Sequence, residues 1–306
     1  MSVRLIVAVT DKDWYDHLRM IPHLDEVNFW SPSPKNFRAL SPGELFLFKL
    51  HSPHDFIVGG GVFAHANTSP CSLAWEAFGE KNGASSFRDM RTRIARYRRL
   101  PQDSREDFPI GCRILTSPFF LPPSQWIPVP SSWKRNIVAF KGYSTAEPDG
   151  RFLWDAVQSA AISQPPTDRV KEDQARFGEP CAVRPRLGQG AFRLLVTDSY
   201  DRRCAVTRES TLPVLDAAHI IPYSDGGTHD PSNGILLRRD LHSLFDRGYV
   251  TVTTDLRFEV SRRIREDYEN GRDYYALHGR EVAVPPSPSL RPDPAGLRWH
   301  NDRFLV

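Results

Sequence analysis

The first half of the chain alternates short apolar segments with polar turns. Four of these segments have the length and composition of β-strands; they are residues 3–9, 44–50, 56–64 and 110–120. Thr10 and Asp11 are both suited to cap a helix over 12–20, and arginines at helical spacing predict another over 85–99. The pattern therefore predicts a small β-barrel with a few helices.

The pattern changes between about residues 144 and 190, where proline, glycine and charged residues interrupt the apolar positions. Short helical patterns at 151–161 and 168–177 remain between these breaks. We expect a domain boundary here.

The second half begins with a helical pattern over 190–203. The segment "TLPVLDAAHII" then reads as a strand, "PYSDGGTHDPSNG" as a loop, and "LRRDLHSLFDRG" as a short helix that Gly248 ends. The predicted order is strand, loop, strand, helix, followed by the strands "YVTVTTD" and "RFEVS". We therefore predict an α+β protein with a first domain over 1–145, a helical linker over 146–189, a second domain over 190–285 and a tail over 286–306.

Composition agrees with two globular domains, because 306 residues with 40% apolar content can build two cores. The apolar run near the N-terminus soon meets Asp11, Lys12 and Asp13, so we expect no signal peptide, no membrane partner and a cytoplasmic protein. The four cysteines form no CxxC pair, and we expect them to be reduced thiols. A net charge of +3 means that any affinity for nucleic acid must come from local arginine clusters.

Three residues in the strand-loop-strand-helix segment suggest hydrolytic chemistry. Hydrolysis of a phosphodiester needs a base that deprotonates water and a cation near the leaving oxygen. His219 on the predicted strand can supply the base, and His242 on the helix can bind a divalent ion together with a carboxylate such as Asp216.

The spacing of His219, Asn233 and His242 resembles the HNH endonuclease motif of the ββα-metal fold. The resemblance implies that His219 is the general base, that Asn233 holds the loop that orients it, and that His242 binds one divalent ion, Mg²⁺ or Mn²⁺. Many HNH proteins carry a metal ligand immediately before the base, where this chain has Ala218. Asp216 would share the strand face of Ala218 and is the substitute we expect, with Asp240 and Asp246 as alternatives.

Arginines flank the motif, and guanidinium groups bind phosphate through paired hydrogen bonds. We expect backbone contacts to DNA from Arg202, Arg203, Arg238 and Arg239. The chain contains no GxxxxGK[ST] phosphate loop, so we expect no nucleotide cofactor.

Aromatic residues gather near the turns of the first half, in "DKDWYDHL", "EVNFWSPSPKNF" and "SLAWEAFGEKNG". With the strand pattern around them, they resemble the EVE-like branch of the PUA superfamily, whose domains hold a flipped, modified base between aromatic side chains. This resemblance implies ring contacts and polar contacts to a base; the candidates are Trp14, Trp30 and Trp75 for the rings and Asp11, Asn28 and Asn36 for the polar groups.

Together the two resemblances predict a type IV-like, modification-dependent endonuclease of the EVE-HNH kind. Its substrate would be double-stranded DNA that carries 5-methyl- or 5-hydroxymethylcytosine, and a double-strand break would require a homodimer or two independent nicks. Two alternatives stay open. In the first, the chain is an HNH nuclease whose first half reads another mark, such as phosphorothioate or modified adenine, or serves only as a scaffold. In the second, the chain is a non-catalytic reader with a decayed nuclease, and Ala218 is the residue that favours this alternative.

Overall fold

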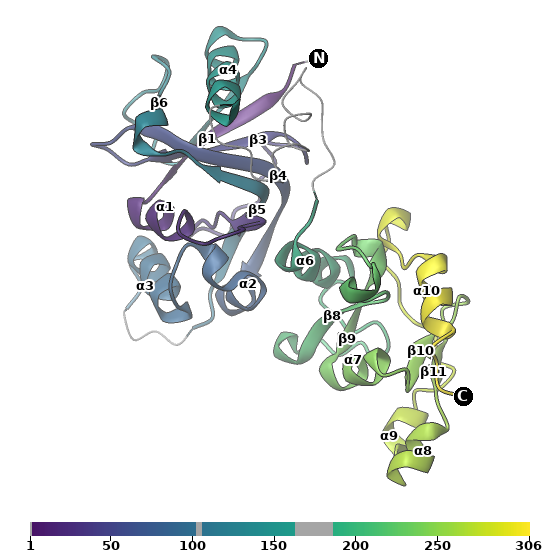
Figure 1. Ribbon diagram of the computed structural model, residues 1–306. Coiled ribbons are helices and arrows are strands. Elements are labelled where there is room, and N and C mark those ends of the chain that lie inside the picture. Colours follow the sequence, from purple (N-terminus) through teal and green to yellow (C-terminus); the bar gives the residue numbers. More distant parts are fainter. Residues whose placement is uncertain (1, 102–105, 163–185) are drawn as a thin grey trace. The chain divides into compact units, whose positions relative to one another are not determined.

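A computed structural model describes residues 2–101, 106–162 and 186–306 (Figure 1). The chain divides into two compact units, residues 1–186 and 187–306, and each is described by itself. The predicted helix over 168–177 and Cys181 lie outside the described residues.

A mixed sheet organises the first unit. Its strands are β1 (Arg4–Thr10), β2 (Glu26–Asn28), β3 (Leu45–Leu50), β4 (Phe56–Pro70), β5 (Pro109–Phe120), β6 (Ile127–Pro128) and β7 (Phe140–Ser144). The order is β2-β5-β4-β3-β1-β7, with β6 paired to β4. The β1–β3 pair is parallel and the other pairs are antiparallel. Among the described strands the path is open, with β2 and β7 at its ends, and the α+β class is confirmed.

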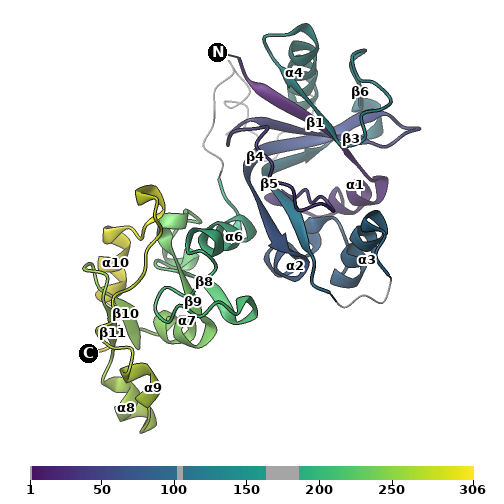
Figure 2. The same cartoon turned by 180° about the vertical axis from the view of Figure 1, so that it is seen from behind.

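Helices cover both faces of this sheet. They are α1 (Lys12–Leu18), α2 (Cys71–Phe78), α3 (Phe87–Arg98) and α4 (Pro148–Ile162). Ile6 and Ala8 of β1 share a core cluster with residues of α1, whereas Leu5 and Val7 share another with residues of α4. Both views show α4 and α1 on opposite sides of the sheet (Figures 1 and 2). Alternate side chains of β1 are thus buried on both faces, which explains its nearly continuous apolar sequence.

Two details of the first unit bear on the sequence patterns. The aromatic residues of the segment "SLAWEAFGEKNG" were expected near turns, but its first seven residues, together with the preceding Cys71, form helix α2. Gly59 lies inside β4, and a Cβ there would come within 2.3 Å of the Phe119 carbonyl oxygen. The glycines of β4 therefore permit close packing of neighbouring backbones within the sheet.

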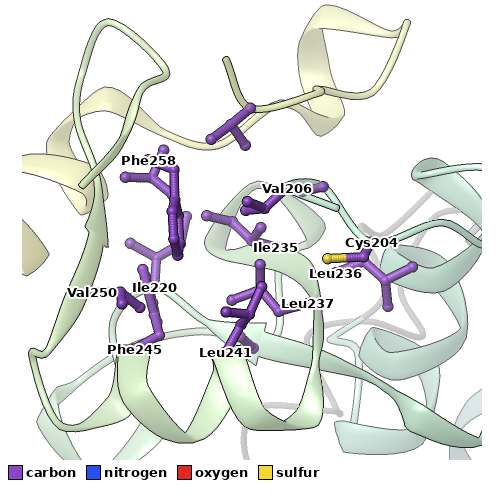
Figure 3. Close-up of a cluster of buried hydrophobic side chains, with 14 of the residues drawn as sticks. Cys204, Val206, Ile220, Ile235, Leu236, Leu237, Leu241, Phe245, Val250 and Phe258 are labelled. Atoms are coloured by element: carbon purple, nitrogen blue, oxygen red, sulfur yellow. The ribbon is translucent and has the colours of Figure 1, made fainter. Parts of the chain in front are cut away.

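The second unit is built around a hairpin crossed by helices. Its elements are α6 (Gln189–Ser199), β8 (Leu215–His219), β9 (Gly234–Arg238), α7 (Arg239–Asp246), β10 (Val250–Val252), β11 (Phe258–Val260), α8 (Arg263–Tyr268), α9 (Arg272–Tyr275) and α10 (Pro294–Asn301). β8 and β9 pair antiparallel, and the predicted order of strand, loop, strand and helix is confirmed. Leu241 and Phe245 of α7 join the hairpin residues Ile235 and Leu237 in one buried core (Figure 3).

The C-terminal residues pack onto this core. Leu297 and His300 of α10 are buried, whereas Trp299 and Phe304 are only half-buried. The His300 ring stacks on Phe245 at 3.6 Å between ring centroids, and its Nε2–H donates to the Phe245 carbonyl oxygen at 3.0 Å. The tail is therefore part of the second unit.

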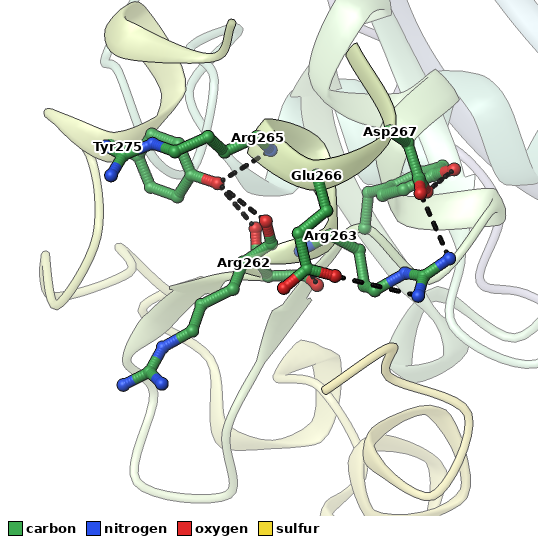
Figure 4. A network of polar contacts seen from close by, with 8 residues as sticks. Arg262, Arg263, Arg265, Glu266, Asp267 and Tyr275 are labelled. Carbon is green, nitrogen blue, oxygen red and sulfur yellow. Dashed lines mark hydrogen bonds and ion pairs between the residues drawn. The ribbon is translucent and has the colours of Figure 1, made fainter. Parts of the chain in front are cut away.

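A surface network fixes α8 (Figure 4). Arg263 pairs with Asp267 at 3.0 Å, and the Tyr275 hydroxyl accepts from the Arg265 backbone N–H at 3.1 Å and donates to the Ser261 carbonyl oxygen at 3.0 Å. These contacts join α8 to α9.

None of the described helices combines the length and the apolar content that crossing a bilayer requires.

Candidate functional site

The β8–β9 hairpin sets the positions of the predicted nuclease residues. His219, the last residue of β8, is paired with Gly234, the first of β9, and Asp216 is paired with Leu237. A Cβ on Gly234 would come within 2.8 Å of the Phe192 ring, so α6 lies closely over this end of the hairpin. Asp216 instead contacts His242 of α7. The hairpin thus places the predicted base beside α6 and the predicted cation ligands beside α7.

His219 lies in a column of rings. Its imidazole stacks on Phe192 with 3.9 Å between ring centroids and an interplanar angle of 11°. Its Nε2 is 3.1 Å from Nδ1 of His229, and the His229 ring stacks on Tyr223 at 4.8 Å and 4°. Contacts on two sides therefore hold the His219 ring in place.

Asn233 braces the loop that joins the two strands. Its Oδ1 accepts from the Ile221 N–H at 2.9 Å, and its Nδ2 donates to the carbonyl oxygens of Ile221 and Thr228, each at 2.9 Å. Only 9% of the residue is exposed. One buried amide therefore ties together both ends of the segment 221–228, next to His219 and His229.

Asp216 and His242 face each other across β8 and α7. Asp216 Oδ2 is 3.8 Å from His242 Nδ1, and His242 Nε2 is 3.4 Å from Asp246 Oδ2. Arg193 and Arg239 each approach an Asp216 oxygen at 3.3 Å. Asp216 is therefore held by three basic side chains, and His242 lies between two carboxylates.

Ala218 and Asp240 are unsuited to bind an ion beside His242. Ala218 is fully buried in the apolar core. Asp240 is engaged by Arg238, whose Nε and Nη2 reach its two oxygens at 2.9 and 2.5 Å. Asp216 and Asp246 are the two candidate carboxylates that the structure brings next to His242.

The pKa values of His219 and His242 are shifted in opposite directions. Burial, with the charges of His229 and His242, lowers the pKa of His219 to about 4, so its imidazole is neutral at pH 7. Burial also disfavours the charged form of His242, but hydrogen bonds and charge from Asp216 and Asp246 outweigh this and raise its pKa to about 9. The pKa of Asp216 is lowered by His242, Arg193 and Arg239 in spite of its burial. One histidine is therefore set to accept a proton, while the other belongs to an ion-pair cluster.

The donor set at Asp216 and His242 fits a divalent ion. A carboxylate oxygen and a neutral imidazole nitrogen are both ligands of Mn²⁺, so His242, whose raised pKa keeps it protonated at pH 7 without an ion, would release a proton on binding one. Mg²⁺ favours carboxylates and is held by few protein groups. Across residues 2–101, 106–162 and 186–306, the structure gathers no set of three or more His, Cys, Asp or Glu side chains able to hold a metal. Asp216 lies at one nitrogen of His242 and Asp246 at the other.

Three of the four arginines predicted to contact DNA form ion pairs with carboxylates in the structure. Arg202 pairs with Asp198 at 3.2 Å, and Arg238 and Arg239 are held by Asp240 and Asp216 as described above. Arg203 is exposed. Arg193 was not singled out from the sequence, because only the packing of α6 on the hairpin brings it to Asp216.

The predicted reader residues separate into a buried tryptophan and a surface group. Trp14 is 3% exposed and packs edge-on against Phe48 at 4.9 Å between ring centroids. Its ring fills the core and offers no face to a base, so Trp14 drops out of the reader set. At the surface, the Tyr97 hydroxyl donates to Asp11 Oδ1 at 2.6 Å, and the centroid of the Tyr97 ring lies 6.4 Å from that of Trp30.

A buried polar group lies next to Trp30. Trp30 Nε1 donates to the Asn82 carbonyl oxygen at 2.9 Å, and Asn28 Nδ2 donates to Asn82 Oδ1 at 2.9 Å. Asn28 is fully buried. Trp75 is half-buried against Phe87, and Asn36 is exposed between β2 and β3. Asp11, Trp30, Asn82 and Tyr97, here called the reader cluster, are thus linked by contacts, and sequence reasoning missed Tyr97 and Asn82.

Comparison with known proteins identifies the nuclease segment. Residues 204–253 match the family model described as HNH endonuclease, so the chain carries an HNH endonuclease domain. A search of curated proteins found no match.

Three solved structures are similar to this chain over half of its length or more. ASCH from Zymomonas mobilis is 6% identical with a TM-score of 0.35, over 51% of this chain and 94% of that one. The modification dependent TagI restriction endonuclease is 15% identical with a TM-score of 0.29, over 97% of this chain and 81% of that one. The type IV phosphorothioation-dependent restriction endonuclease ScoMcrA is 11% identical with a TM-score of 0.19, over 78% of this chain and 49% of that one.

Proposed function

We propose that this chain is a modification-dependent DNA endonuclease. Its first unit reads a modified cytosine, 5-methyl- or 5-hydroxymethylcytosine, and its second unit hydrolyses phosphodiester bonds. The observation that supports this most directly is the placement of a neutral, immobilised His219 on the same hairpin as the Asp216–His242 pair, within a matched HNH segment.

The side chains divide the chemistry between them. His219 takes a proton from the attacking water, because its lowered pKa keeps it unprotonated at neutral pH. Asp216 and His242 would hold one Mg²⁺ or Mn²⁺, and a bound ion of this kind stabilises the negative charge that develops on the leaving oxygen. Asn233 keeps the loop in the conformation that carries this site.

Arginines on α6 and α7 supply the affinity for the DNA backbone. Arg193 and Arg239 flank Asp216, and Arg203 is exposed on the same unit. Contacts to phosphates set the position of the protein without reading sequence, so the nuclease unit itself selects weakly. One such site cuts one strand, and we propose a homodimer for a double-strand break.

Selectivity comes from the first unit. Trp30 and Tyr97 of the reader cluster offer aromatic surface, and Asp11 offers a carboxylate for hydrogen bonds to a base edge, while the buried Asn82 holds the Trp30 ring through its carbonyl oxygen. A flipped base recovers on such rings the stacking energy that it loses on leaving the duplex.

Cleavage of matched plasmids tests the whole proposal. Unmodified, 5-methylcytosine and 5-hydroxymethylcytosine plasmids are incubated with the full chain and Mg²⁺, Mn²⁺ or EDTA. We expect metal-dependent cutting of modified DNA alone. Equal cutting of all three would eliminate the reader, and failure to cut any of them with either metal would favour a decayed nuclease.

Two substitutions separate the roles. His219→Ala should lower the cleavage rate by about 10²–10⁴-fold, because it removes the general base. Binding to modified DNA should persist, since the His219 side chain makes none of the proposed phosphate contacts. Trp30→Ala should lower the preference for modified DNA, whereas the matched control Trp299→Ala, in the second unit, should leave it unchanged. Loss of binding in His219→Ala, or unchanged discrimination in Trp30→Ala, would contradict these assignments.

A further inference from the structure

His229 lies against the proposed base, although it is outside the His219, Asn233 and His242 spacing. Its Nδ1 is 3.1 Å from His219 Nε2, within hydrogen-bond distance. Two neutral imidazoles can share one such bond only if one ring donates its N–H and the other accepts it. The direction of this bond therefore decides which nitrogen of His219 keeps a free lone pair.

Only one direction leaves His219 able to act as a base. If His229 donated, Nε2 of His219 would be occupied as the acceptor, and its single proton would be on Nδ1. If His219 donates from Nε2, its Nδ1 is unprotonated and can accept a proton from water. Burial lowers the pKa of His219 to about 4, so the ring carries a single proton at neutral pH, and that proton lies on either Nδ1 or Nε2.

We propose that His229 is a positioning residue for the general base: its Nδ1 accepts the hydrogen bond from His219 Nε2–H and thereby makes Nδ1 of His219 the nitrogen that takes the proton from water. This inference rests on the proposed nuclease function. When the proton arrives, His219 carries N–H groups on both nitrogens, and the bond to a neutral His229 acceptor stabilises the resulting charge.

The loop holds His229 in the position that this role requires. The His229 ring stacks on Tyr223 with a 4° interplanar angle, and the preceding carbonyl, that of Thr228, accepts from Asn233 Nδ2. On the following side, Asp230 caps the turn by accepting from the Ser232 N–H at 3.1 Å. His229 therefore lies between two anchored residues, with its ring fixed from one face.

Two substitutions distinguish a hydrogen-bonding role from a packing role. His229→Phe keeps a ring that can stack on Tyr223 but has no nitrogen, whereas His229→Asn loses the ring but keeps an oxygen close to the position of Nδ1. We expect the Phe variant to lower kcat by about 10–100-fold with KM little changed, by analogy with the loss on removing a group that orients a metal-ligating histidine. The Asn variant should recover most of the activity. The reverse order would overturn the proposal, because packing alone favours Phe.

A second measurement does not depend on cleavage. The full chain is labelled with ¹⁵N-histidine, the His219 signals are assigned by comparison with His219→Ala, and long-range ¹H–¹⁵N spectra report which nitrogen carries the proton. We expect the Nε2–H form in the wild type and a mixture of forms in His229→Phe. An Nδ1–H form in the wild type would overturn the proposal. Failure of the nuclease function itself would appear separately, as an inactive wild type.

Discussion

Replacement of Asn233 by alanine removes the brace of the 221–228 loop. The change deletes three hydrogen bonds from a side chain that is 9% exposed, and leaves the Ile221 N–H and the carbonyls of Ile221 and Thr228 without this partner. At about 1 kcal/mol for each bond, the free energy of unfolding of the second unit falls by about 3 kcal/mol. For a unit spanning residues 187–306, this corresponds to a melting temperature lower by about 12 °C.

Differential scanning calorimetry and amide hydrogen exchange measure this effect. The transition of the second unit should move down, and the Ile221 amide should exchange faster than in the wild type. Asn233→Asp should be at least as damaging, since it keeps the acceptor for the Ile221 N–H but sets a carboxylate oxygen against two carbonyls. Ser232→Ala is the matched control, because it removes one local hydrogen bond to Asp230. An unchanged transition and unchanged Ile221 exchange in Asn233→Ala would refute the brace.

Three further predictions concern the same unit. Gly227→Ala should disturb the loop and lower both stability and cleavage, since its Cβ would lie 1.9 Å from the Ile221 carbonyl oxygen; normal activity in this variant would contradict the close approach. Burial lowers the pKa of His300, so stability should fall as the pH drops below about 6.5, where the unfolded chain takes up a proton that the folded state resists. His300→Gln has no group that titrates here, so the difference in free energy of unfolding between the wild type and this variant should shrink as the pH falls below about 6.5 in urea titrations. A difference that stays constant with pH would contradict this prediction. Arg238 lowers the pKa of Asp240, so this pair stabilises the fold above about pH 4 and loses its effect as the pH falls through the folded pKa. Asp240→Asn should lower the free energy of unfolding by less than about 1 kcal/mol at pH 7, because both side chains are partly exposed. A larger loss would show that the pair is better shielded from solvent than its exposure implies.

The sequence predicts the hairpin and its helix well because local signals define them. Glycine, proline and asparagine mark the loop between two apolar runs, and the resulting register pairs His219 with Gly234. The same register places Asp216 on the side of the hairpin that α7 covers, so its approach to His242 follows from strand and helix periodicity. These elements depend on neighbours close in sequence.

The rest of the site depends on packing between distant segments. His229 reaches His219 only because the loop path is fixed by Asn233, and Arg193 reaches Asp216 only because α6 packs on the hairpin. Trp14 illustrates the opposite case, in which an aromatic residue near a turn becomes buried: a Cβ on Gly83 would come within 2.0 Å of its ring. No local pattern signals these contacts.

The docking of α10 has a consequence for the design of chimeric nucleases. The HNH match ends at residue 253, yet His300 covers the Phe245 ring, caps the end of α7 through the Phe245 carbonyl, and contacts the Thr251 hydroxyl of β10 at 2.7 Å. A graft cut at residue 253 would expose that ring and remove the imidazole donor, leaving the Phe245 carbonyl oxygen with only its bond from the Gly248 N–H. The transplantable cassette therefore has to include α10, and a fusion joint belongs beyond Asn301 instead of at the border of the motif.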